Sequence, residues 1–161
     1  AVIYRHFGAE DAASMAQDLR RITHEAGVRL LIGLDAELAE VVEADGVHLP
    51  EHALDQAPRL RRRHPHWLIT GAVHQGETLV ALKTLETHSL DACVLSPVFK
   101  AGGASAAKPD LGLDQFSALC ALAPCPVYGL GGITAKRAPL MLQTGACGIA
   151  GVDALVAAFT A

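Results

Sequence analysis

The stretch Val127-Tyr128-Gly129-Leu130-Gly131-Gly132-Ile133-Thr134 decides the fold class of this chain. An apolar run leads into paired glycines and then into a helical pattern, and a similar order returns in Gly148-Ile149-Ala150-Gly151-Val152-Asp153. Glycine lets backbone N–H groups approach a ligand closely, and the amino end of a following helix favours an anion. The two segments predict a site for a phosphate-like ligand, although glycines also end strands as plain tight turns.

The rest of the chain repeats this pattern. Apolar segments alternate with amphipathic ones, which is typical of a parallel sheet whose strands are joined by helices. The expected strands are Val2–Phe7, Val28–Leu34, Gly46–Leu49, Trp67–Val73, Ala92–Phe99, Pro126–Leu130 and Gly148–Val152. The expected helices are Ala12–Ala26, Ala36–Ala44, Leu54–His64, Glu77–His88, Leu113–Leu122 and Thr134–Ala146, with a last one from about Asp153. In the first helix, the spacing predicts that Met15, Leu19 and Ile22 face the core.

Composition predicts one compact domain over residues 1–161. The chain has 161 residues, 51% of them hydrophobic, and a formal net charge of −4 at pH 7. This acidic balance argues against a nucleic-acid-binding protein, which normally shows a basic face. No segment approaches the roughly 20 apolar residues of a membrane span, so we expect no membrane contact and a cytoplasmic location. The four cysteines show no C-x-x-C pairing and are expected to be reduced core thiols.

Five short motifs follow one another at predicted strand ends. They are Asp45-Gly46-Val47-His48-Leu49, Gly71-Ala72-Val73-His74, Ser96-Pro97-Val98-Phe99, Gly131-Gly132-Ile133 and Gly145-x-x-Gly148-Ile149-Ala150. In this order and spacing they resemble the thiamine-phosphate synthase and TenI family. The resemblance implies an α/β fold, the TIM (β/α)8 barrel, with Val2–Phe7 as its second strand. The first βα unit is then absent from this sequence; we favour upstream residues over an open barrel, whose edges would leave backbone groups unpaired.

The family joins hydroxymethylpyrimidine diphosphate to thiazole phosphate and releases pyrophosphate with the help of Mg²⁺. The resemblance places Arg5 at the diphosphate, which suits its planar guanidinium. His74 and Lys108 are the other candidate catalytic residues. Lys100 and Ser105 are open alternatives to Lys108 as an anion contact. The candidate residues for binding substrate or phosphate are His48, Ala72, Ser96, Gly131, Gly132, Val152 and Asp153.

Several positions depart from the family pattern. Gly33 and Leu34 stand where the synthases have an Asn-Asp pair, and Ala53 replaces a second metal-binding Asp. Because Mg²⁺ demands oxygen ligands, we assign no metal ligand; Asp35, Glu37 and Glu51 lie close by in the sequence and are the only substitutes considered. Pro97 replaces the histidine that TenI proteins are thought to use, and Asp153, where a neutral Ser is common, would repel a phosphate or cap the last helix.

Three functions therefore stay open. The chain is a thiamine-phosphate synthase with relocated Mg²⁺ ligands, a TenI-like isomerase that uses His74 or His48 for proton transfer, or a non-catalytic protein that binds a phosphorylated ligand. A histidine metal cluster of His6, His48, His52 and His74 has no supporting ligand spacing. The expected partner is a small phosphorylated heterocycle, thiazole phosphate or thiamine phosphate, and the sequence leaves open whether the chain forms a homodimer.

Overall fold

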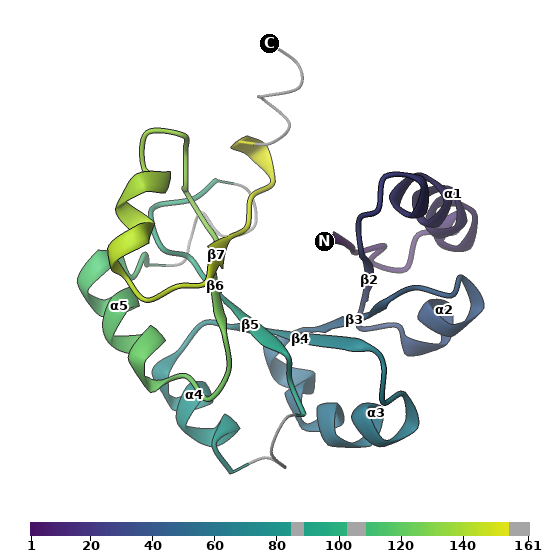
Figure 1. Cartoon of the computed structure of the whole chain (residues 1–161), viewed down its shortest axis with the longest axis horizontal. Coiled ribbons are helices and arrows are strands. Elements are labelled where there is room, and N and C mark those ends of the chain that lie inside the picture. The colour runs from purple at the N-terminus through teal and green to yellow at the C-terminus, as the bar shows by residue number, and fades with distance from the viewer. Residues whose placement is uncertain (85–88, 103–108, 155–161) are drawn as a thin grey trace. The chain divides into compact units, whose positions relative to one another are not determined.

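The computed structural model describes residues 1–84, 89–102 and 109–154, and it shows a parallel sheet with helices between its strands (Figure 1). Seven strands follow one another in the sheet in chain order. They are β1 (Val2–Tyr4), β2 (Leu30–Gly33), β3 (Gly46–Leu49), β4 (Leu68–Val73), β5 (Ala92–Leu95), β6 (Val127–Gly129) and β7 (Gly148–Ile149). The parallel α/β fold is thus confirmed, and the closed eight-stranded barrel stays a prediction.

Except after β6, the helices follow the strands as expected. The α-helices are α1 (Ala12–Glu25), α2 (Ala36–Val41), α3 (Ala57–Arg63), α4 (Gly76–Leu82) and α5 (Gly112–Leu122). Two 3₁₀-helices are η1 (Glu51–Gln56) and η3 (Ala138–Gln143). No helix in the described part of the chain is long and apolar enough to cross a membrane.

The chain divides into two compact units. Unit 1 contains Ala1–Gly71 and Ser89–Asp91, and unit 2 contains Ala72–His88 and Ala92–Ala161. In unit 1, β1 pairs with β2, β2 with β3, and β3 with the first part of β4, and all these pairs are parallel. Helices α1, α2 and α3 lie on one side of these strands (Figure 1). The core of unit 1 is aliphatic, with Leu30, Ile32, Val47, Leu49 and Ile69 fully buried.

Unit 2 follows the same plan. Strand β6 pairs in parallel with β5 and with β7. Phe116 of α5 is fully buried, as are Leu79, Leu95 and Val98. Gly129 in β6 allows this packing, because a Cβ there would lie 2.6 Å from Met141 Cε and 3.0 Å from Phe116 Cζ.

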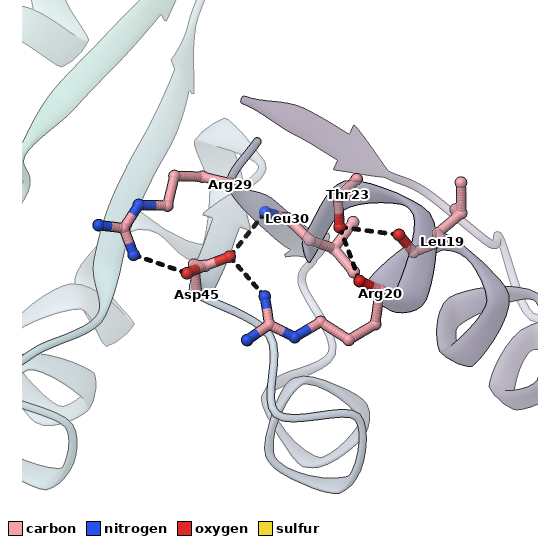
Figure 2. A network of polar contacts seen from close by, with 6 residues as sticks. All are labelled: Leu19, Arg20, Thr23, Arg29, Leu30 and Asp45. Atoms are coloured by element: carbon pink, nitrogen blue, oxygen red, sulfur yellow. Dashed lines mark hydrogen bonds and ion pairs between the residues drawn. The ribbon is translucent and has the colours of Figure 1, made fainter. Parts of the chain in front are cut away.

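Asp45 joins three strands of unit 1 at their amino ends. Its backbone N–H donates to the Leu30 carbonyl at 2.9 Å, and its carbonyl accepts from the Leu68 N–H at 2.9 Å. Its carboxylate accepts from the Leu30 N–H at 2.9 Å and forms ion pairs with Arg20 at 2.9 Å and Arg29 at 2.7 Å (Figure 2). Glycine follows at position 46, where a Cβ would lie 2.0 Å from the Leu68 oxygen.

Asp91, directly before β5, makes the same kind of contacts with the amino end of β4. Its backbone N–H donates to the Ile69 carbonyl at 2.8 Å, and its carboxylate accepts from the Ile69 N–H at 2.7 Å. Arg61 of α3 pairs with the same carboxylate. An aspartate directly before a strand therefore fixes the amino end of the preceding strand in two places.

The predicted core face of the first helix is wrong for Met15 and Ile22, whereas Leu19 is half-buried. Met15 and Ile22 are 44% and 51% exposed, whereas Ala16 and Thr23 are buried. Thr23 satisfies its hydroxyl within the helix, because Oγ1 donates to the Leu19 carbonyl at 2.7 Å (Figure 2). The helix presents the face of Ala16, Thr23 and Arg20 to the strands, and from this face Arg20 binds Asp45.

The predicted helix Thr134–Ala146 is also wrong in form. The Thr134 carbonyl accepts from the N–H groups of Arg137 and Ala138, which makes a turn, and only η3 follows. Pro139 lies in the first turn of η3 and has no N–H to continue a helix that started earlier. The expected core position of all cysteines holds for Cys93, which is buried, but not for Cys147, which is exposed.

We expect the substitution Asp45→Asn to destabilise the chain by about 1–3 kcal/mol at pH 7, because the amide keeps an acceptor for Leu30 but loses both ion pairs. Burial alone would raise the pKa of Asp45, but the Leu30 N–H, Arg29 and Arg20 outweigh burial and lower it. A lowered pKa adds stability above the unfolded-state pKa of about 3.9, and this stability is lost as the pH falls through the folded-state pKa. Urea unfolding at several pH values measures the difference.

The matched control is Asp18→Asn, which changes an exposed aspartate of α1. This control should unfold like the unmodified chain at every pH. A difference between Asp45→Asn and the unmodified chain that stays constant down to pH 3 would contradict the proposed role of the Asp45 charge.

Candidate functional site

Arg5 follows β1 directly and lies against Gly33 at the carboxyl end of β2. A Cβ at Gly33 would lie 2.9 Å from Arg5 Cγ and 3.2 Å from the Tyr4 carbonyl oxygen. The Arg5 guanidinium carbon lies 4.5 Å from the centroid of the Phe7 ring, within the range of a cation–π contact. The stem of Arg5 therefore needs the glycine that replaces the family's asparagine.

His6 and Asp35 connect the loops that follow β1 and β2. His6 Nδ1 accepts from the Gly8 N–H at 3.0 Å, and its Nε2 lies 3.3 Å from Asp35 Oδ2. The other Asp35 oxygen accepts from the Leu38 N–H at 2.8 Å and caps α2. The sequence alone did not predict this pair. Both contacts engage the Asp35 carboxylate, which is one of the possible substitute ligands for Mg²⁺.

His48 lies in β3 and is 9% exposed. Its Nδ1 is 2.9 Å from Thr70 Oγ1 of β4. Burial and, to a smaller extent, the positive charge of Arg5 lower the pKa of His48 to about 4. His48 is therefore neutral at pH 7, so it offers a ligand hydrogen bonding rather than positive charge.

The residues at the carboxyl ends of β2 and β3 do not fit a Mg²⁺ site. Leu34 is 45% exposed and Ala53 is 2% exposed, and neither side chain has an oxygen ligand. Glu37 lies in the first turn of α2, Glu51 begins η1, and Asp35 is engaged as described. Within residues 1–84, 89–102 and 109–154, no three or more His, Cys, Asp or Glu side chains are grouped to hold a metal ion.

In unit 2, His74 and Ser96 contact each other. His74 Nδ1 lies 2.8 Å from the Ser96 carbonyl oxygen and 3.2 Å from Ser96 Oγ. Because a carbonyl only accepts, His74 carries its proton on Nδ1, and its Nε2 has the lone pair in the neutral ring. Ser96 is 5% exposed, so it holds His74 in place and is poorly placed to contact a ligand itself.

Gly131 and Gly132 form the loop after β6, and both have positive φ angles, of 103° and 62°. A Cβ at Gly131 would lie 2.7 Å from Pro97 Cβ, and one at Gly132 would lie 2.5 Å from the Lys100 carbonyl oxygen. Among the described residues, no hydrogen bond uses the backbone N–H of Gly131, Gly132 or Ile133 as its donor. We call this loop the glycine cradle; its donors suit an anion.

Arg137 is a cation beside the glycine cradle that sequence reasoning missed. Its Nη1 donates to the Gly132 carbonyl at 2.9 Å, and its guanidinium carbon lies 4.8 Å from the centroid of the Phe99 ring. The side chain is exposed. The sequence does show an arginine five residues after a glycine pair, but the predicted helix Thr134–Ala146 included this arginine and gave it no role at the site.

The remaining predicted site residues are placed as follows. Ala72 is half-buried in β4, Val152 is 66% exposed, and Asp153 is exposed. A Cβ at Gly102 would lie 4.0 Å from Asp153 Oδ2, which puts the Asp153 carboxylate near the loop after β5. Lys108 and Ser105 lie outside the described residues. The structure thus brings Arg5 and His48 close to each other in unit 1, and His74 and Ser96 in unit 2.

The sequence matches known proteins over most of its length. The profile of a family described as thiamine monophosphate synthase matches residues 1–155. A protein of Aquifex aeolicus (strain VF5), named provisionally as a second thiamine-phosphate synthase, is 34% identical over 139 residues, which are 86% of this chain and 72% of that protein. The thiamine-phosphate synthase of Methanoculleus marisnigri is 32% identical over 146 residues, which are 91% of this chain and 68% of that protein.

Two solved structures share the fold. A thiamine phosphate pyrophosphorylase from Pyrococcus furiosus matches with a TM-score of 0.75 and 22% identity, over 93% of this chain and 70% of that one. A 3-hexulose-6-phosphate synthase matches with a TM-score of 0.65 and 17% identity, over 98% of this chain and 84% of that one. These structures show the fold, and the profile match and the two sequence relatives show that the chain belongs to the thiamine monophosphate synthase family.

Proposed function

We propose that this chain binds the phosphate group of a thiazole phosphate or of thiamine phosphate at the glycine cradle. The observation that carries the proposal is the steric requirement at Gly131 and Gly132, where any side chain would meet Pro97 or Lys100. Glycine keeps the backbone accessible there, and the N–H groups of the loop have no acceptor among the described residues. Donors of this kind contact phosphate oxygens in many phosphate sites.

Arg137 supplies positive charge to the same site. One of its five N–H donors binds the Gly132 carbonyl, and the guanidinium stacks on Phe99. Both contacts fix the guanidinium beside the cradle, so little freedom is lost when an anion binds.

The joining reaction of the family needs more than a phosphate cradle. In that reaction Mg²⁺ neutralises the charge that builds up on the departing diphosphate. Here Leu34 and Ala53 carry no ligand oxygen, and Asp35 is held by the Leu38 N–H and His6. We therefore propose that the ligand binds without Mg²⁺ and that the chain does not perform Mg²⁺-dependent thiamine phosphate synthesis.

The phosphate proposal predicts that thiamine phosphate binds to this chain and that unphosphorylated thiamine binds at least about tenfold more weakly. Gly132→Ala should weaken thiamine phosphate binding by about tenfold or more, because lost backbone contacts to a phosphate are worth about 1.5–3 kcal/mol. Isothermal titration calorimetry measures both effects. The control is Gly102→Ala, where a Cβ would have no neighbour closer than 4.0 Å. Equal affinity for thiamine and thiamine phosphate would refute the proposal.

Arg137→Ala should weaken thiamine phosphate binding by about tenfold at low salt, and the loss should shrink as salt screens the charge. Arg137→Lys should restore part of the affinity, because it returns the charge without the planar guanidinium. Lys136→Ala removes the neighbouring exposed cation and is the matched control. If both alanine variants lose the same affinity, the effect comes from net charge and not from the position of Arg137.

The proposal also predicts the outcome of the joining assay. When hydroxymethylpyrimidine diphosphate and thiazole phosphate are supplied with Mg²⁺, we expect no thiamine phosphate beyond the amount formed with EDTA. Chromatography of the product measures this, with circular dichroism to show that the protein is folded. Product formation that EDTA abolishes would show that Asp35, Glu37 or Glu51 holds the metal and that the chain is a working synthase.

A further inference from the structure

The four cysteines of this chain meet at the amino ends of β5, β6 and β7, in unit 2. The Cys93 N–H donates to the Pro126 carbonyl at 2.9 Å, and the Cys147 N–H donates to the Val127 carbonyl at 2.8 Å. Cys93 and Cys147 therefore lie on the two sides of the segment that Cys125 begins. Cys120, in α5, approaches from the helix layer, because a Cβ at Gly145 would lie 3.7 Å from Cys120 Cβ.

Two of these cysteines lie close to each other. The Cys93 N–H donates to the carbonyl of Pro126, the residue after Cys125, so the two cysteines lie on adjacent backbone segments, and the Cys125 thiol acts on the Cys93 thiol. Cys93 is fully buried in β5, and Cys125 is half-buried in the connection between α5 and β6. A disulfide requires two backbones that approach closely, and the hydrogen bond from Cys93 to Pro126 holds the segments of Cys93 and Cys125 next to each other.

The two thiols differ in what they can do. The hydrogen bond with Cys125 and burial raise the pKa of Cys93, so Cys93 keeps its proton at pH 7. Cys125 is the less buried residue of the pair. Thiol oxidation begins at the accessible sulfur, and a neighbouring thiol then closes a disulfide.

We propose that Cys125 and Cys93 form an oxidisable dithiol that takes a small peroxide as its substrate, with Cys125 as the attacking thiol and Cys93 as the resolving thiol. The Cys125 sulfur attacks one peroxide oxygen; an S–O bond forms, the O–O bond breaks, and the leaving oxygen takes a proton to become water. The Cys93 sulfur then attacks the sulfenic acid sulfur; an S–S bond forms, the S–O bond breaks, and the Cys93 proton leaves with the hydroxyl as a second water. Two thiols are oxidised, and one peroxide is reduced to two waters.

Cys147 is the competing thiol. It is exposed, and its Sγ lies 3.1 Å from the Val127 carbonyl, to which it donates. It occupies the position before β7 that Asp45 and Asp91 occupy before β3 and β5, since all three donate their N–H to the preceding strand. Its partner for a disulfide would be Cys120, so the experiment must separate this pair from Cys93 and Cys125.

The test uses the whole chain with Cys120→Ser and Cys147→Ser, which keeps only the proposed pair. After treatment with hydrogen peroxide, we expect two free thiols to be lost, the mass to fall by two hydrogens, and peptide mapping to show Cys93 linked to Cys125. Cys93→Ala in this background should leave Cys125 as a sulfenic acid that dimedone traps. A reductant should restore both thiols in the variant that keeps Cys93.

Two results would overturn the proposal. The first is oxidation of Cys125 to a sulfenic or sulfinic acid while Cys93 remains a free thiol. The second is a map of the peroxide-treated unmodified chain in which Cys120 is linked to Cys147 and the other two cysteines stay reduced. Because this map needs no substitution, it decides the matter even if Cys93→Ala does not fold.

Discussion

The Asp45 contacts are the constraint on which unit 1 depends. One residue uses its N–H, its carbonyl and its carboxylate to hold β2 and β4 beside β3. The two arginines that pair with it come from α1 and from the residue before β2, so the same carboxylate also links the first helix to the strands. A partly buried carboxylate loses stabilisation when one of its donors is removed, and this favours one geometry of the elements that supply them.

Asp45 and Asp91 hold the amino ends of the strands, and the candidate functional residues lie at the carboxyl ends. In unit 1 these ends bear Arg5, which lies against Gly33 and Phe7, and the pair of His6 and Asp35. The arrangement is self-consistent: Gly33 makes room for the Arg5 stem, and Asp35 both caps α2 and pairs with His6. Restoring the asparagine of the family at position 33 alone would therefore displace Arg5 rather than rebuild a metal site.

The strands could be predicted from the sequence because each is a short apolar run followed by a loop signal, and parallel order then follows from the helices between them. The orientation of α1 could not be predicted, since Met15 and Ile22 fit the core pattern better than Arg20 does, and the contact of Arg20 with Asp45 links residues 25 positions apart in the sequence. The same holds at the site. The glycine cradle was visible as a local motif, but the contacts of His6 with Asp35 and of Arg137 with Gly132 depend on how loops fold back, which periodicity does not encode.

The glycine cradle and the Mg²⁺ site of the family have separate physical requirements. A chain can therefore keep the cradle without the metal site. A backbone cradle needs only glycine at two positions and close packing against Pro97 and Lys100, and those contacts are intact. A Mg²⁺ site needs several oxygen ligands at once, so losing two carboxylates removes the site as a whole. Arg137, fixed on Phe99, adds charge for a phosphate and none for a metal. The residues therefore favour a protein that recognises the phosphorylated half of the family's chemistry.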